Sequence, residues 1–403
     1  MDRQSILVVV GNYWQIPLIE KLKEMGYRAL VVNPYADSPA FPYADGYLQV
    51  DIFNKDAICN YCKMEKVVGI LTDANDFAVT AVAELAARLG LTGIGMEQAE
   101  LFTNKYKMRK KLLERELLVP SFALCKDIKE VEAFYHIHQT KMIIKPLDNS
   151  SSRGIHSFEN LDRLEEYYAD ACQYSRSNMG ILVEEYIEGT EFTVDGIKTP
   201  DKHYSLAVSE KKHFRHNENV ACELFFSYEN DNYDYVKIRE LNDKIIEYSD
   251  LPYGLTHVEY KFHDGQFWLM EMAARGGGNW ISSKIVPWVS GIDTYQYLIN
   301  CSVGKISNEK FIIKQYYKKR CAVLKFFETD NEGVVKEVKG IEYLDNEAVV
   351  CYRFEFKIGD EIKLAQNDVS RIGFYIACSE NKEELVRVMN EIEENVVIVL
   401  KGE

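Results

Sequence analysis

Long hydrophobic runs are missing from this sequence. No stretch of its 403 residues approaches the roughly 20 uncharged apolar residues that a membrane-spanning helix requires. The first residues, MDRQSILVVVGNYW, carry an acidic residue and then a strand pattern, where a signal peptide would have an apolar core. We therefore expect a cytoplasmic protein without a membrane partner.

An excess of positive charge is missing as well. The chain has 48 Lys and Arg against 63 Asp and Glu, a formal net charge of −15. This sign excludes a protein that holds nucleic acid by neutralising phosphates, so a polyanionic ligand would need a local basic pocket. Hydrophobic residues make up 47% and charged residues 28%, which excludes disorder and predicts packed interiors.

The sequence also lacks a cysteine framework. Its nine cysteines are an odd, scattered set, which is typical of reduced and mostly buried thiols. Cys59 and Cys62 form one close pair, but no second CxxC exists to complete a zinc site. Among the eight histidines, only His213 and His216 are close in sequence, and this spacing is more typical of polar contacts than of metal ligation.

Two common nucleotide-binding motifs are absent. The first expected strand leads into VVVGNYWQIP, with one glycine and a proline, where a dinucleotide site would have GxGxxG. A P-loop, GxxxxGK followed by Ser or Thr, does not occur. A nicotinamide-dependent dehydrogenase is therefore disfavoured, and any nucleotide must be held in another way.

The first hundred residues alternate strand and helix patterns. Continuous apolar strands that alternate with amphipathic helices predict a parallel sheet of the α/β class. The expected strands are 6–10, 29–32 and 67–71, and the expected helices are 16–25 and 77–89.

The rest of the chain has a different pattern. After a basic helix at 105–116 and a break at Pro120, short strands and helices predict an α+β region. Its expected strands are 142–145, 181–186, 192–197, 204–209, 255–262 and 267–273, with helices near 128–138, 161–175 and 233–248. From about residue 305, alternating strands, a charged helix at 382–393 and a last strand at 396–400 predict a third, β-rich domain.

Two acidic residues lie either side of one expected hairpin turn, in THVEYKFHDGQFWLMEMAARGGG. With a two-residue loop at Asp264 and Gly265, Glu271 would pair with Val258, and Glu259 and Glu271 would face opposite sides of the sheet. A three-residue loop or a bulge at Gly265 would place the two glutamates directly opposite each other. Polarity favours this second register, which puts His257 and Lys261 on the glutamate face and Val258, Tyr260 and Phe262 on the other.

Two carboxylates that face each other repel, and each raises the pKa of the other unless a cation lies between them. Mg²⁺ suits such a pair because it binds one or two carboxylates together with substrate phosphates. The alternative is a solvated hairpin face whose acidic side chains are unrelated.

Further segments favour a phosphate site. Arg275 follows Glu271 by four residues and enters three glycines, where missing side chains let the backbone approach an anion. The stretch KPLDNSSSRGI begins at Lys145 and contains a Ser/Arg/Gly loop that could fold over phosphates, or could be an ordinary surface linker. In VEEYIEGTEFTVDG, acidic side chains would suit the hydroxyls and the amine of an adenosine.

In the order of these motifs the chain resembles the ATP-grasp family over nearly its whole length. The matching segments are TNKYKMRK, IIKP, SSSRG, VEEYIEGTE, THVEY and MEMAARGGG, and ILTDANDFAVTAVAELAARLGLTG resembles the pre-ATP-grasp domain of biotin carboxylase and the purine-pathway ligases. The resemblance implies a pre-ATP-grasp parallel-sheet domain at 1–103, an ATP-grasp domain with two α+β lobes at 104–304, and a C-terminal β-rich domain at 305–403. A mobile lid lobe would lie at about 122–190.

The resemblance also implies roles for individual residues. Glu259 and Glu271 would bind Mg²⁺, with Mn²⁺ as an alternative, and Arg275 would face the transferred phosphoryl group. Ala273 stands where many members have an asparagine as a further metal ligand, a variant that resembles amino-acid ligases of the family. The residues implied to contact ATP are Lys105, Lys145, the loop of Ser150, Ser151, Ser152, Arg153 and Gly154, the adenine-reading Glu184, Glu185, Tyr186 and Ile187, the ribose-binding Glu191, and Lys211 as a further phosphate contact.

We therefore expect an ATP-dependent ligase that activates a carboxylate as an acyl phosphate for attack by an amine, on an amino acid or small metabolite. Catalysis would rest on positioning and charge neutralisation, and the lack of a GxSxG signature agrees with this. Alternatives are a phosphoribosylglycinamide synthetase-type ligase, a biotin carboxylase component, and a catalytically degenerate ATP-binding module, which Ala273 keeps open. The expected partners are small molecules, with a homodimer as an open alternative, and specificity is expected in loops at 213–220 and 279–288.

Overall fold

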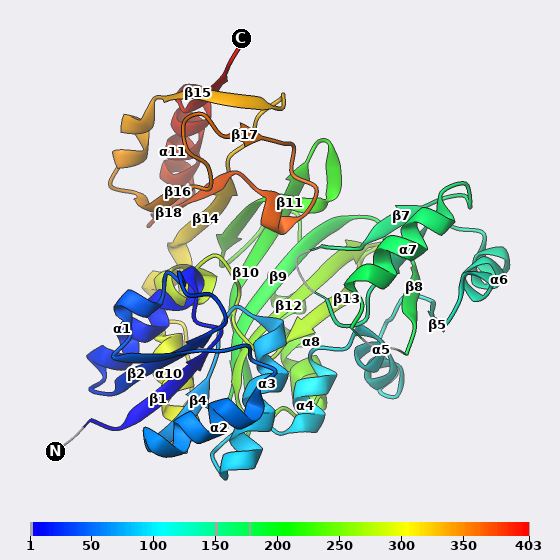
Figure 1. The fold of residues 1–403 in the computed structure, drawn as a ribbon. Coiled ribbons are helices and arrows are strands. Elements are labelled where there is room, and N and C mark those ends of the chain that lie inside the picture. The colour runs from blue at the N-terminus through cyan, green and yellow to red at the C-terminus, as the bar shows by residue number, and fades with distance from the viewer. Residues whose placement is uncertain (1–2, 150–151, 177–178, 403) are drawn as a thin grey trace.

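The computed structural model describes residues 3–149, 152–176 and 179–402. Its first part is a four-stranded parallel sheet in the order β3-β2-β1-β4, with helices packed on it (Figure 1). Its strands are β1 (Ser5–Val9), β2 (Arg28–Asn33), β3 (Gly46–Gln49) and β4 (Val67–Leu71), and its helices are α1 (Ile16–Glu24), α2 (Lys55–Met64) and α3 (Asp76–Leu89). The predicted α/β character of this region is confirmed.

The residues of this sheet explain its burial. Strand β1, SILVV, is buried along its whole length because helices and further chain cover both faces, as parallel strands require. Two of the flanking helices begin with a side-chain cap: Asn54 and Asn75 accept hydrogen bonds from backbone N–H groups at the beginnings of α2 and α3. Helix α3 ends at Gly90, whose φ of +66° suits a left-handed cap.

A second, smaller lobe projects to one side, where Figure 1 shows it in green and cyan. Helices α4 (Met96–Leu101) and α5 (Lys105–Leu113) lead to it. We call residues 122–185 the lid lobe, a sheet in the order β5-β8-β6-β7 with two covering helices. Its elements are β5 (Phe122–Cys125), α6 (Ile128–His138), β6 (Met142–Lys145), β7 (His156–Phe158), α7 (Leu164–Tyr174) and β8 (Ile181–Glu185).

An antiparallel sheet of eight strands forms the centre of the molecule, in the order β13-β12-β9-β10-β11-β14-β18-β16. The first five strands are β9 (Thr190–Lys198), β10 (His203–Phe214), β11 (Asn217–Ser227), β12 (Gly254–His263) and β13 (Gln266–Ala273), with α8 (Tyr235–Tyr248) packed on them. After β13 the chain forms a π-helical turn (Ile281–Ile285), α9 (Val286–Ser290) and α10 (Thr294–Ser302). Strand β11 was not expected from the sequence.

The C-terminal part continues the same sheet. Strands β14 (Cys321–Phe326), β16 (Val349–Phe354) and β18 (Gly373–Ser379) extend it, because β14 pairs with β11 from Ala322 to Lys325. A separate small sheet and one helix cover this extension, namely β15 (Gly333–Lys339), β17 (Glu361–Ile362), β19 (Val397–Leu400) and α11 (Lys382–Asn395). One sheet therefore runs across the domain boundary predicted near residue 305.

The largest hydrophobic core joins these parts. Side chains of the parallel sheet, such as Val8, pack in one cluster with Ile197 of β9 and Ile376 of β18. No helix among the described residues is both long and apolar enough to cross a membrane. The mixed α/β architecture agrees with the predicted fold class.

Candidate active site

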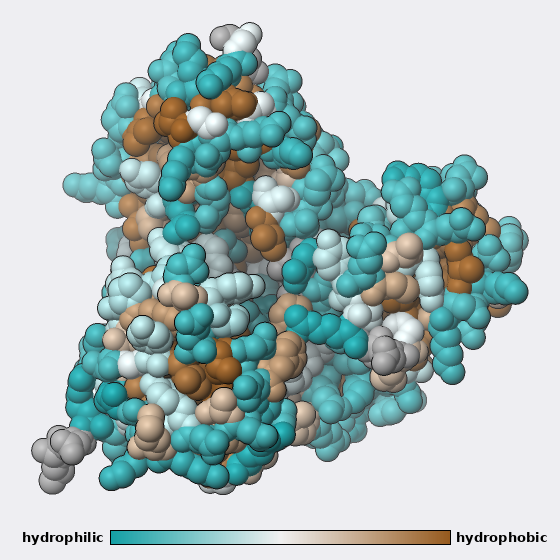
Figure 2. Space-filling model, viewed as in Figure 1, coloured by the Kyte–Doolittle hydropathy of each residue, from teal (hydrophilic) through white to brown (hydrophobic). Residues whose placement is uncertain are grey.

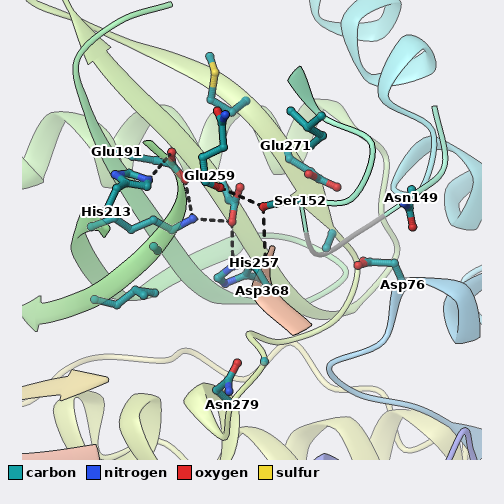
Figure 3. Close-up of a pocket in the computed structure, with 18 of the residues that line it drawn as sticks. Asp76, Asn149, Ser152, Glu191, His213, His257, Glu259, Glu271, Asn279 and Asp368 are labelled. Atoms are coloured by element: carbon teal, nitrogen blue, oxygen red, sulfur yellow. Dashed lines mark hydrogen bonds and ion pairs between the residues drawn. The ribbon is translucent and has the colours of Figure 1, made fainter. Parts of the chain in front are cut away.

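A cavity of about 500 Å³ opens where the parallel sheet, the lid lobe, the central sheet and its C-terminal extension meet. Figure 2 shows this face of the molecule hollowed between the first part, the lid lobe and the C-terminal part. The lining includes Asp76 of α3, Lys145 of β6, Glu259 of β12, Glu271 of β13 and Arg371, which precedes β18. Acidic and basic side chains from distant segments thus share one space (Figure 3).

The two hairpin glutamates lie directly opposite each other, as predicted, because Glu259 pairs with Glu271 in the β12–β13 ladder. The predicted cause of this register, a three-residue loop or a bulge at Gly265, was wrong. The loop has two residues, Asp264 and Gly265, whose φ angles of +46° and +75° suit a primed hairpin turn. The register shift occurs instead at Met270, an extra residue between the Tyr260–Leu269 pair and the glutamate pair.

The bulge at Met270 has a second effect. Its carbonyl oxygen accepts a hydrogen bond of 2.8 Å from the guanidinium of Arg109, a fully buried side chain of α5. The hairpin is therefore anchored to α5 at the point where the glutamates come into register. As predicted, Val258 and Tyr260 lie on the opposite, buried face.

Each of these glutamates has a lysine partner. Lys211 Nζ lies 2.7 Å from Glu259 Oε1 and 2.6 Å from Glu191 Oε1. Lys105 Nζ lies 2.7 Å from Glu271 Oε1. Burial would raise the pKa of Glu259, but the charge of Lys211 outweighs burial and holds that pKa well below its ordinary value. The same carboxylates oppose the effect of burial on Lys211 and raise its pKa.

The donor set suits a magnesium ion. The carboxylates of Glu259 and Glu271 face each other from adjacent strands, and both line the cavity with 28% and 29% of their side chains exposed. The lysine contacts involve Oε1 of each glutamate. Oxygen donors that retain contact with solvent fit Mg²⁺, which keeps several waters or phosphates among its ligands. No cluster of three or more His, Cys, Asp or Glu suited to a metal occurs in the described part of the chain.

His257 lies beside this pair. Its Nδ1 is 2.9 Å from Asp195 Oδ1 and its Nε2 is 3.7 Å from Glu259 Oε1. Burial would lower the pKa of His257, but the negative charge of Asp195 outweighs burial and raises it to about 9. His257 therefore carries a proton at neutral pH and adds positive charge to this wall.

A buried ion network lies at the lid side of the cavity. Glu184, with 1% of its side chain exposed, pairs with Arg109 and with Lys145, whose Nζ is 2.8 Å from Glu184 Oε2. Burial would raise the pKa of Glu184, but the charges of Arg109 and Lys145 lower it to about 2. The side chain of Glu184 thus fixes Lys145 at the cavity, while its own carboxylate is fully engaged.

The neighbouring residues of the predicted adenosine segment also line the cavity, namely Glu185, Tyr186, Ile187 and Glu191. The Tyr186 hydroxyl accepts a hydrogen bond of 3.1 Å from Lys261. Burial would raise the pKa of Glu191, but Lys211 and His213 lower it to about 2. In Figure 3, His213 and Glu191 lie side by side at one end of the cavity.

Arg275 is oriented by a residue that the sequence analysis did not single out. Its Nε and Nη2 each lie 2.8 Å from a carboxylate oxygen of Asp76, at the start of α3. Burial would raise the pKa of Asp76, but the charge of Arg275 lowers it. Such a bidentate pair fixes the plane of the guanidinium and holds Arg275 at the cavity.

The first two of the three glycines after Arg275 are required by close packing. A Cβ on Gly276 would collide with the Ser282 hydroxyl, and one on Gly277 would lie 2.9 Å from Asp195 Oδ1. The backbone N–H of Gly276 donates to Asp73 Oδ1 at 2.8 Å, and burial raises the pKa of Asp73. Asp195 of β9 accepts a hydrogen bond of 3.2 Å from the Gly277 N–H, so Asp73, after β4, and Asp195 both hold the glycine segment.

The predicted phosphate loop is only partly described. Ser150 and Ser151 lie outside the described residues. Ser152 lines the cavity, and its hydroxyl donates to the Asn219 carbonyl oxygen at 3.1 Å. Arg153 and Gly154 are not among the lining residues; Arg153 donates to the Asn149 side chain at 2.9 Å, and Gly154 is buried against Tyr174.

Sequence reasoning missed two groups of site residues. Asp73 and Asp76 directly follow β4, and the carboxyl ends of parallel strands are where ligands bind, so their position was a usable signal. The C-terminal wall, with Asp368 and Arg371, had no such signal because only the folded sheet brings it to the cavity.

The sequence matches two family models. Residues 138–284 match the ATP-grasp domain, and residues 325–401 match the L-amino acid ligase C-terminal domain 2. The chain therefore contains an ATP-grasp domain, as its motifs predicted, and an L-amino acid ligase C-terminal domain. Proteins of the ATP-grasp family use ATP and Mg²⁺.

Three individual proteins show which ligases this chain is similar to. The chain is 23% identical to the L-arginine-specific L-amino acid ligase of Bacillus subtilis over 318 residues, which cover 76% of this chain and 74% of the relative. Its fold resembles the L-amino acid ligase from Bacillus licheniformis, with a TM-score of 0.83 and 18% identity over 100% of both chains. It also resembles phosphoribosylglycinamide synthetase from Anaerococcus prevotii, with a TM-score of 0.73 and 20% identity over 99% of this chain and 100% of the other.

Proposed function

We propose that this protein is an ATP-dependent ligase that joins the carboxylate of an amino acid to an amine. The observation that carries the proposal is the direct opposition of Glu259 and Glu271 in one cavity with Lys105, Lys145 and Arg275. An opposed acid pair surrounded by cations suits a bound Mg²⁺ with a nucleotide triphosphate. The match of the C-terminal region to the amino acid ligase model supports an amino acid as the carboxylate substrate.

The chemistry requires activation of the carboxylate. A carboxylate resists amines because it is anionic and would have to expel oxide, whereas an acyl phosphate expels phosphate. Bound Mg²⁺ would neutralise phosphate charge and orient the terminal phosphoryl group of ATP. Phosphoryl transfer to the carboxylate forms ADP and the acyl phosphate, and attack by the amine then releases phosphate and forms the amide.

The protein contributes charge and position. Glu259 and Glu271 would hold the metal, and their lysine partners, Lys211 and Lys105, would then be available to the phosphates. Lys145 is already fixed at the cavity by Glu184, and Arg275 by Asp76. Groups placed before the reaction stabilise developing charge without reorganising. No side chain needs to act as a nucleophile.

The adenosine would lie between the lid lobe and the central sheet. Glu185, Tyr186 and Ile187 line that side, and Glu191 lies beside them. The backbone of this segment would read the adenine, and Glu191 would accept hydrogen bonds from the ribose hydroxyls. The loop of residues 150–154 would cover the phosphates.

A purine-type ligase is the second candidate, favoured by the structural likeness to phosphoribosylglycinamide synthetase. That reaction also joins a carboxylate to an amine, but it needs a site for a ribose phosphate. The C-terminal match favours the amino acid ligase.

The test is formation of ADP from ATP and Mg²⁺ across a matrix of amino acids and amines, with products identified by mass spectrometry. We expect ADP, phosphate and an amide in equal amounts for at least one pair. Hydroxylamine should replace the amine and trap the acyl phosphate as a hydroxamate. A matrix in which phosphoribosylamine with glycine is the active pair would select the second candidate, and the absence of turnover with every pair would contradict both.

A further inference from the structure

The C-terminal extension of the central sheet adds a wall to the cavity, and Ser152 of the proposed phosphate loop reaches this wall at Asp368, 3.5 Å from its Oδ2. Arg371, in the turn before β18, lines this wall together with Asp368 and Phe326. The guanidinium carbon of Arg371 lies over the Phe326 ring, 3.8 Å from its centroid. Stacking of this kind fixes the plane of the cation without neutralising its charge.

Arg371 is an under-satisfied buried cation. Only 11% of its side chain is exposed, and its contact with an acid is at Nη2, 2.7 Å from Asp368 Oδ1. Its buried Nε has no hydrogen-bond partner among the described residues. A guanidinium carries five N–H donors, and burying one without a partner is costly, so this arrangement favours an additional anionic ligand.

Two other cations of the cavity, Arg275 and Lys211, are paired more fully with acids, whereas Lys261 contacts the Tyr186 hydroxyl. Arg275 forms a bidentate pair with Asp76, and Lys211 contacts two glutamates. These groups lie on the sides where the nucleotide and the metal are proposed to bind. Arg371 lies on the C-terminal wall and lines the same cavity as Glu259. It can therefore hold an anionic group within reach of the reaction centre.

An apolar floor lies beside Arg371. Leu324 and Phe326 are two residues apart on β14, so their side chains lie on the same face of the sheet. Leu324 pairs with Leu224 of β11, and Phe326 pairs with Phe374 of β18. All four side chains line the cavity. A cation at the edge of an apolar strip suits a ligand with one carboxylate and one apolar side chain.

We propose that Arg371 binds a carboxylate carried by the amine substrate, whose apolar side chain packs on the strip of Leu224, Leu324, Phe326 and Phe374. This assignment rests on the proposed ligase function. The carboxylate held by Arg371 is not the one that is activated, because an ion pair with the guanidinium makes its oxygens weaker nucleophiles toward the terminal phosphorus of ATP. Arg371 thus selects amines that carry an anion and orients their nitrogen toward the acyl phosphate.

The experiment compares two amines that differ in the carboxylate. The acyl substrate is the amino acid that gives the most hydroxamate with hydroxylamine and the wild-type protein. With that substrate, the ratio of kcat/KM for L-leucine to kcat/KM for L-leucinamide is measured in wild type, Arg371→Gln and Arg371→Lys. Comparing this ratio between variants cancels the intrinsic difference in reactivity of the two amines. We expect Arg371→Gln to lower the ratio at least 10-fold and Arg371→Lys to lower it less.

The matched control is Arg320→Gln. Arg320 also stacks on an aromatic ring, 4.2 Å from the centroid of Trp288, and also pairs with one acid, Glu380 at 3.1 Å, but it does not line the cavity. The ratio of kcat/KM for L-leucine to kcat/KM for L-leucinamide should be the same in Arg320→Gln as in the wild type.

The outcomes separate the two proposals. If the wild type forms no hydroxamate with any amino acid, the proposed function fails. If hydroxamate forms but Arg371→Gln leaves the ratio unchanged, as when it lowers both rates equally, the role of Arg371 is overturned. Equal lowering of both rates would also follow if Arg371 contacted the transferred phosphate. If Arg371→Gln does not fold, Arg371→Lys decides by the same ratio.

Discussion

At the scale of single residues, the site is built from charges that neutralise one another. Glu259 and Glu271 would repel if left alone, and Lys211 and Lys105 lie within 2.7 Å of them. A metal that enters between the carboxylates would replace this contact and leave the lysines to the phosphates of ATP. The protein therefore holds the lysines in place before the ligand binds.

Replacing Glu271 with Gln should stop nucleotide turnover while the protein remains folded. The amide keeps the shape but removes one anionic metal ligand, so ADP formation should fall at least about 100-fold. The free energy of unfolding should fall by only about 1–2 kcal/mol, because Lys105 keeps its hydrogen bond to the Asn149 carbonyl oxygen. ADP release and urea unfolding check both values.

Glu337→Gln is the control for this change, since Glu337 forms an exposed pair with Lys339 at 3.6 Å and does not line the cavity. ADP formation at the wild-type rate by Glu271→Gln would contradict the metal role of Glu271.

The buried Glu184 should make the fold sensitive to acid. Its pKa is lowered from 4.5 to about 2 in the folded state, so its stabilising contribution is complete above pH 4.5 and is lost as pH falls toward 2. A pH of 3 lies about 1.5 units below the unfolded-state pKa of 4.5. Each unit lowers the free energy of unfolding by about 1.4 kcal/mol, so the loss at pH 3 is roughly 2 kcal/mol. Urea unfolding of the wild type and of Glu184→Gln at pH 6 and pH 3 measures this loss of unfolding free energy. The wild type should lose roughly 2 kcal/mol more than the variant, and equal losses would contradict the assignment.

At the scale of elements, cation–π contacts of Arg176 connect the lid lobe with the first domain. Arg176, just after α7, lies over the Phe77 ring of α3, 3.9 Å from its centroid. Helix α3 also carries Asp76, which orients Arg275. The contact therefore connects the position of the lid with the part of the first domain that faces the cavity.

Replacing Arg176 with Ala should loosen the lid lobe without unfolding the protein. A partly exposed cation–π contact contributes about 0.5–1 kcal/mol, which is small against global stability but sufficient to shift a lid equilibrium several-fold. Hydrogen exchange in residues 122–185 should become faster while the melting temperature changes by less than about 2 °C. In the control Arg163→Ala, the arginine stacks on Tyr167 within the lid itself, and exchange should match the wild type.

At the scale of the whole molecule, the central sheet unites the ATP-grasp region with the C-terminal region. The pairing of β11 with β14 crosses residue 305, and Phe226 of β11 is fully buried in the shared core. Removing the C-terminal strands would expose this edge and this apolar face together. Long, apolar strand edges promote aggregation.

A fragment of residues 1–304 should therefore fail to fold into a soluble, active protein. Expressed alone, it should aggregate or unfold without a cooperative transition, whereas the full chain should unfold cooperatively. Solubility, size-exclusion chromatography and thermal unfolding monitored by circular dichroism compare the two. A monomeric fragment with a cooperative transition would show that the boundary at 305 separates independently stable domains.

The sequence by itself determined the α/β first region, the hairpin of Glu259 and Glu271 and the order of the ATP-grasp motifs. These three predictions depend on local features, namely hydrophobic periodicity, an Asp-Gly turn and residue types at short spacing. The alternation of polar and apolar residues predicted that the two glutamates face each other. It could not locate the extra residue at Met270, because the same alternation is compatible with an extra residue in the loop or in the strand.

Only the tertiary structure decided which residues complete the site. Asp76 meets Arg275 across 199 residues of sequence, and Arg371 reaches the cavity because β14 and β18 extend the sheet begun by β9 to β13. Such contacts depend on the pairing of distant strands and on the packing of a helix start against a loop. Side-chain patterns along the chain do not encode these distances, so the partners of the site's charges appear only after folding.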